Sequence, residues 1–147
     1  MYDNGTQSYR RTRVLTADPR NLVILCYEGA IDSLKIGKQR IAEKDYEGRS
    51  KALDKAQDII SELLCSLNFE KGGSIAKNLD SLYNYMLRRI IHADLKNDVR
   101  AVDEVIGMLT ELKAAWEEIF YRQDNGIRPE KIVLDQEKRR ASGTVSA

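Results

Sequence analysis

Apolar residues recur at helical spacing along four stretches of the chain, and no stretch shows the strict alternation typical of strands. The first stretch begins after Asp18-Pro19, an N-cap residue followed by a proline at the first helical position. Four amphipathic helices joined by short loops predict an all-α fold, an antiparallel up-down-up-down four-helix bundle. The predicted helices cover residues 19–42, 45–67, 74–96 and 98–124.

Breaks between these stretches indicate where helices begin and end. Asp45 can cap the second helix, and Asn97 or Asp98 can cap the fourth. Residues 68–73 end in paired glycines and predict a loop, with Ser74 as the N-cap of the third helix.

Apolar content falls at both ends of the chain, which predicts three parts. Residues 1–17 read as a flexible N-terminal arm, because their few apolar positions lie among polar and basic residues. Residues 18–126 form the four-helix bundle domain, which Gly126 closes as a left-handed C-cap. Residues 127–147 form a C-terminal tail that has room for a short helix.

The first predicted helix carries more apolar surface than one core face requires, since residues 22–27 are apolar around the whole circumference. Along its length the helix has two stripes. The bulky stripe is typical of a core face, and the small stripe either receives a closely packed neighbouring helix or leaves a groove for another molecule. The bulky stripe is Val23, Tyr27, Ile31 and Leu34, and the small stripe is Cys26, Gly29, Ser33 and Gly37.

Net charge, the length of the apolar runs and the cysteines argue against several classes of protein. The 147 residues have a net charge near +1, so the overall field gives no reason to expect nucleic acid as a partner. No apolar run approaches the roughly 20 residues of a membrane span, and the polar start is no signal peptide. Cys26 and Cys65 sit in apolar helical patterns typical of free thiols, which favours the cytoplasm.

The sequence lacks the residue constellations of common catalytic and metal sites. His92 is the only histidine, and no Glu-x-x-His or Cys-x-x-Cys motif occurs. Gly72-Gly73 lacks the rest of a phosphate-binding fingerprint. We therefore expect no enzyme activity, no cofactor and no metal. An all-α enzyme that uses arginine clamps, as chorismate-mutase-like bundles do, stays open, with Arg88 and Arg89 as its candidates, although both suit a helix edge better.

With common catalytic and metal sites excluded, the remaining feature that suggests a function is surplus apolar surface. The third helix carries Tyr83 and Tyr85 beside Leu82, Met86 and Leu87, the side chains that helix-in-groove recognition uses. A wider core or a homodimer face explains the same pattern, and the residues alone leave both interpretations open.

The chain also contains a series of motifs whose order and spacing resemble those of a known family. Over residues 9–119 the chain resembles the FliS family, cytosolic export chaperones of bacterial flagellin. The motifs are Tyr9 with Thr16-Ala17-Asp18-Pro19, Tyr27-Glu28-Gly29-Ala30-Ile31, Lys55-Ala56-Gln57-Asp58-Ile59-Ile60, Glu62-Leu63, Gly72-Gly73, Ile75-Ala76-Lys77-Asn78-Leu79, Leu82-Tyr83-Asn84-Tyr85 and Trp116-Glu117-Glu118-Ile119. One departure is Cys26, where family members commonly carry leucine.

The resemblance implies a chaperone that binds the disordered C-terminal segment of flagellin in hydrophobic surface grooves, prevents premature polymerisation and delivers it to the flagellar type III export gate. The N-terminal arm can cover part of this surface in the free protein. The alternative is a self-associating helical-bundle protein without a flagellin client. The expected partner-binding residues are Tyr9, Val14, Leu15, Leu22, Cys26, Tyr27, Gly29, Ser33, Ile60, Leu64, Leu79, Leu82, Tyr83, Met86, Val102 and Ile106.

Two expectations about the first helix follow from this interpretation. The small stripe is favoured as the place where flagellin approaches most closely. Tyr27→Asp is expected to weaken the flagellin complex while leaving the helical circular dichroism intact.

Overall fold

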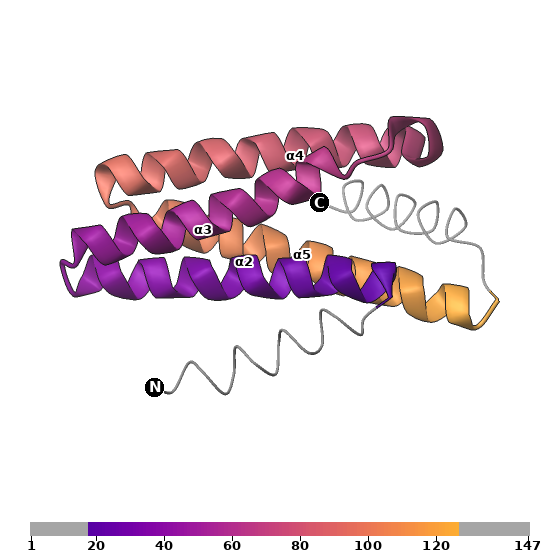
Figure 1. Ribbon diagram of the computed structural model, residues 1–147, viewed down its shortest axis with the longest axis horizontal. Coiled ribbons are helices and arrows are strands. Elements are labelled where there is room, and N and C mark those ends of the chain that lie inside the picture. Colours follow the sequence, from indigo (N-terminus) through magenta and orange to yellow (C-terminus); the bar gives the residue numbers. More distant parts are fainter. Residues whose placement is uncertain (1–17, 127–147) are drawn as a thin grey trace, which may run out of the picture. The chain divides into compact units, whose positions relative to one another are not determined.

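A computed structural model describes residues 18–126, which form four α-helices and contain no strand. Consecutive helices run in opposite directions, so the predicted all-α four-helix bundle is confirmed (Figure 1). The chain divides into two compact units, residues 1–113 and 114–147. The predicted arm, residues 1–17, and tail, residues 127–147, lie outside the described residues, and the predicted domain boundaries stay a prediction. The helices are α2 (Pro19–Ala42), α3 (Tyr46–Cys65), α4 (Phe69–Lys96) and α5 (Val99–Asp124).

Side-chain caps fix where three of the helices begin, as the sequence predicts. Each capping carboxylate accepts hydrogen bonds from backbone N–H groups that the first turn leaves without a helical partner. Asp18 accepts from Asn21 at 2.9 Å, Asp45 from Gly48 at 3.0 Å, and Asp98 from Arg100 and Ala101 at 3.0 and 3.3 Å.

The start of α4 corrects the sequence prediction. The helix begins at Phe69 rather than after Ser74, and its N-cap is Asn68, which accepts from the Lys71 N–H group at 3.0 Å. The paired glycines do interrupt the helix, because Gly73 has φ 51° and ψ −126°. A single capped turn therefore precedes the break, and the long part of α4 follows it.

Asp98→Ala is expected to lower the stability of the bundle near neutral pH and to have little effect in acid. Hydrogen bonds from the start of α5, the Ala101 N–H group first, lower the pKa of Asp98. A carboxyl whose pKa is lowered by folding stabilises the folded state above its unfolded pKa, and that contribution is lost as the pH falls below about 4. Urea midpoints at pH 7 and pH 3 measure the difference.

Asp54→Ala is the matched control, since Asp54 is exposed on α3 and its side chain makes no hydrogen bond or ion pair with the described residues. An equal loss of stability in both variants, or a loss from Asp98→Ala that persists at pH 3, would contradict a charged cap.

The core contains apolar residues from all four helices. Tyr27, Ile31 and Leu34 of the bulky stripe are buried, as the stripe predicts, while Val23 is half-buried. Burying this apolar surface provides the main driving force for folding. The largest fully buried side chains are Tyr27, Leu34, Leu53, Ile60, Met86, Ile90, Val102, Val105 and Leu109.

Candidate partner-binding surface

The small stripe of α2 faces α3. A Cβ atom added at Gly37 would lie 2.6 Å from Cδ2 of Leu53, and one added at Gly29 would lie 3.4 Å from Cδ1 of Ile59. Ser33 between them is 4% exposed. The closely approaching neighbour is therefore a helix of the same chain. This corrects the preference for the stripe as the closest point of approach for flagellin.

Cys26 lies at the N-terminal end of this stripe and is half-buried. Burial raises the pKa of its thiol, and the nearby charge of Glu62 on α3 raises it further. A protonated thiol behaves as a small apolar group at neutral pH. Cys26 thus continues the apolar surface of α2 as a leucine would, with less volume.

Tyr27 and Tyr83 form a buried pair between α2 and α4. Tyr27 is 0% exposed, and the two hydroxyl groups hydrogen-bond to each other. Their ring centroids lie 6.5 Å apart with the rings tilted. Burial, together with the neighbouring Tyr27, raises the pKa of Tyr83. Both tyrosines belong to the core, so the expectation that Tyr27 contributes directly to a surface groove is wrong for this structure.

The other predicted contact residues fall into three groups, because helical periodicity marks an apolar face without saying what covers it. Ile60, Leu79, Met86 and Val102 are buried with Tyr27, Ser33 and Tyr83. Leu22, Cys26, Gly29, Leu64, Leu82 and Ile106 are half-buried. Tyr9, Val14 and Leu15 lie outside the described residues.

The N-terminal half of α2 keeps the unusual character that its sequence predicts. Each residue from Leu22 to Cys26 is half-buried, and none is fully buried or fully exposed. A helix with a single core face would alternate buried and exposed positions over this distance. Apolar side chains therefore reach the surface around the whole helix here, which is unusual unless another molecule covers them.

The sequence interpretation missed several exposed apolar side chains elsewhere. Phe69 and Ile75 are exposed on either side of the break at Gly73, and Ile91 and Leu95 are exposed one turn apart on α4. Leu95 is 75% exposed. The four-residue spacing of Ile91 and Leu95 was a usable signal, because residues four apart share a helix face.

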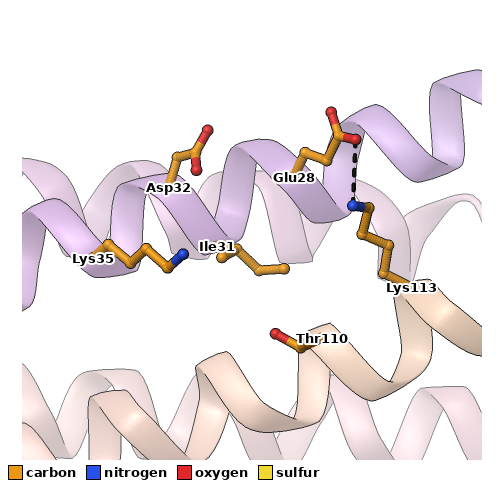
Figure 2. A pocket seen from close by; sticks show the side chains of 6 residues that line it. All are labelled: Glu28, Ile31, Asp32, Lys35, Thr110 and Lys113. Atoms are coloured by element: carbon orange, nitrogen blue, oxygen red, sulfur yellow. Dashed lines mark ion pairs between the residues drawn. The ribbon is translucent and has the colours of Figure 1, made fainter.

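A hollow of about 330 Å³ lies between α2 and the part of α5 that ends at Lys113 (Figure 2). Lys113 bridges it through an ion pair with Glu28 at 3.4 Å, and Ile31 is the one apolar side chain among the described residues that line it. The Thr110 hydroxyl donates to the Ile106 carbonyl of its own helix at 2.7 Å. The hollow is thus a polar notch rather than an apolar groove.

The residues singled out for chemistry lie at the surface. His92 contacts Asp98 at 3.1 Å, and Arg89 pairs with Glu104 at 3.2 Å. Glu104 also accepts a hydrogen bond from Tyr85, which raises the pKa of that phenol. These contacts tie α4 to α5 and form no buried arginine cluster, since Arg88 is exposed.

Two further properties concern residues 18–126 alone. No three His, Cys, Asp or Glu side chains in this range are grouped so that they could hold a metal ion. None of the helices described is both long enough and apolar enough to cross a membrane.

Comparison with known proteins shows the family of this chain. The family profile described as "Flagellar protein FliS" matches residues 2–123. The flagellar secretion chaperone FliS of Salmonella typhimurium is 39% identical over 79% of this chain and 90% of its own length. The Bacillus subtilis protein of the same name is 33% identical over 78% and 85%.

A solved structure has the same fold. The crystal structure of a bacterial flagellar chaperone superposes with a TM-score of 0.67 at 19% identity, covering 80% of this chain and 98% of the other. The confirmed bundle, the family profile and the curated relatives agree. The chain therefore belongs to the FliS family of flagellar secretion chaperones.

Proposed function

We propose that this protein is a cytoplasmic export chaperone that binds the C-terminal segment of flagellin, keeps it from polymerising early and delivers it to the flagellar type III export gate. Family membership supports a chaperone role in flagellar export. The observation that carries the flagellin proposal is the continuous half-buried apolar run from Leu22 to Cys26 on α2. We also propose that the protein has no enzyme activity.

The half-buried members of the predicted set other than Gly29, which lies against Ile59 of α3, supply the direct contacts in this proposal. They are Leu22, Cys26, Leu64, Leu82 and Ile106. The buried members of the predicted set pack in the core and fix the positions of these helices.

An apolar surface of this kind suits a client that is disordered before it binds. Such a client loses conformational entropy on binding, so an extended interface must compensate. Burial of apolar area contributes about 25 cal/mol per Å², and many half-exposed side chains spread over several helices provide such area.

Binding of flagellin with and without its C-terminal segment tests this function. The full-length flagellin should form a stable complex by size-exclusion chromatography, and the truncated one should not. Equal binding of both would contradict the proposal. A dimer that light scattering shows to be unchanged by flagellin would instead support a self-associating protein.

Leu22→Gln and Leu82→Gln are expected to weaken the flagellin complex by about tenfold or more, because each places an amide where apolar contact is needed. The unfolding midpoint should change little, since both residues are half-buried in the free protein. Titration calorimetry measures the affinity.

Leu95→Gln is the matched control. Leu95 is more exposed than either residue and lies on α4 outside the proposed surface. Equal weakening by all three variants would show a general loss of hydrophobicity and would contradict the proposed contacts.

A further inference from the structure

A groove lies at the opposite end of α2 from the proposed flagellin surface. It measures about 300 Å³ and runs between the C-terminal part of α2 and the first turns of α3. Small side chains leave this space open: Gly48 and Ala52 line its α3 wall. A Cβ atom added at Gly48 would lie 2.4 Å from the Asp45 carboxylate that caps α3, so a larger residue there would have to displace the cap. Ile36 lines the α2 wall and is 47% exposed.

Among the described residues that line this groove, the charged side chains are all cationic: Arg40, Lys51 and Lys55. Arg40 is held by Glu43 at 3.0 Å and by Asp45 at 3.7 Å, so its charge is largely balanced. The two lysines are more available for an outside partner.

Lys51 and Lys55 differ in their ion pairs. Lys51 pairs with Glu47 at 3.4 Å, but their side chains are 77% and 84% exposed, so this pair contributes little. Among residues 18–126, no ion pair involves Lys55. Because they are four residues apart on one helix, the two ammonium groups project from the same face one turn apart.

We propose that this groove binds an acidic amphipathic helix of a second protein other than flagellin. Two carboxylates one turn apart on that helix pair with Lys51 and Lys55, and the apolar side chain between them packs on Ile36 and Ala52. The spacing of the lysines matches residues four apart on a helix, and the apolar floor between basic rims matches an amphipathic face. Charge complementarity selects the partner and its orientation.

Two synthetic helical peptides test this proposal on the full chain. One carries two glutamates four residues apart around a leucine, and the other carries lysines in their place. At low salt the glutamate peptide should bind and shift the NMR signals of the Ile36 methyl groups and the Ala52 amide. The double variant Lys51→Glu/Lys55→Glu should lose about tenfold or more in affinity and should bind the lysine peptide instead.

Lys77→Glu is the control, because Lys77 is exposed on α4 outside the groove. It should bind the glutamate peptide as the unaltered protein does. Absence of binding, unchanged binding to the double variant, or signal shifts elsewhere would overturn the proposal. The double variant should also bind flagellin normally, and a loss there would assign the groove to the flagellin surface instead.

Discussion

Tyr27→Asp is expected to unfold the bundle rather than to affect flagellin binding alone. Tyr27 has no exposed surface, and its hydroxyl pairs with that of Tyr83 across the core. The substitution removes a large ring and places a carboxylate in its site. The cavity and the buried charge together should cost more than about 4 kcal/mol, against a total stability of about 5–15 kcal/mol for a typical domain. Far-UV circular dichroism and urea unfolding measure the outcome.

Tyr27→Phe is the control, because it keeps the ring and removes the hydroxyl. It leaves the Tyr83 hydroxyl without this partner and should cost about 1–3 kcal/mol with helicity intact. A Tyr27→Asp variant with unchanged helicity and unfolding midpoint would contradict the core assignment and return Tyr27 to the surface.

Gly37→Leu is expected to destabilise the protein by about 2–3 kcal/mol, since it forces apart the closest approach between α2 and α3. The first added atom already lies 2.6 Å from Cδ2 and 3.1 Å from Cγ of Leu53, a residue that is itself fully buried. Neither helix can shift without disturbing the core on its other side. Urea unfolding of the variant measures the loss.

Gly107→Leu is the matched control on α5. An added Cβ at Gly107 meets nothing within 4 Å, and leucine has a higher helix propensity than glycine. This variant should be about 0.5–1 kcal/mol more stable than the unaltered protein. A Gly37→Leu variant that gains stability in the same way would show that α3 does not pack closely there. Adding Leu53→Ala to Gly37→Leu should recover part of the loss if the clash causes it.

Local chemistry explains why the helices could be predicted from the sequence. The caps at Asp18, Asp45 and Asp98 act within one turn of chain, and apolar periodicity within each helix marks one face. The prediction of where α4 begins was wrong, and the reason is local as well. Asn68 caps a single turn before Gly73, and the paired glycines suggested that the whole segment was a loop.

The binding surface was harder to predict, because burial depends on residues far away in the chain. The small stripe of α2 has the same pattern whether α3 or a client fills it, and the distance between Gly37 and Leu53 decides the case. Tyr27 and Leu22 belong to the same apolar run, yet one is buried and the other half-buried. The basic groove at Lys51 and Lys55 could not be predicted from the sequence either, because the apolar residues of its floor come from two different helices.

The single tryptophan of the chain gives solution experiments a local probe. Trp116 stacks on Phe120, with ring centroids 5.5 Å apart, inside the unit that begins at Ala114. The Tyr27–Tyr83 pair belongs to the other unit. Tryptophan fluorescence therefore reports on the later unit. The change in tyrosine absorbance on unfolding reports chiefly on the buried pair of the earlier unit, because Tyr121 in the later unit is exposed before unfolding. Unfolding curves recorded with both signals would coincide only if the two units lose their structure in one cooperative transition.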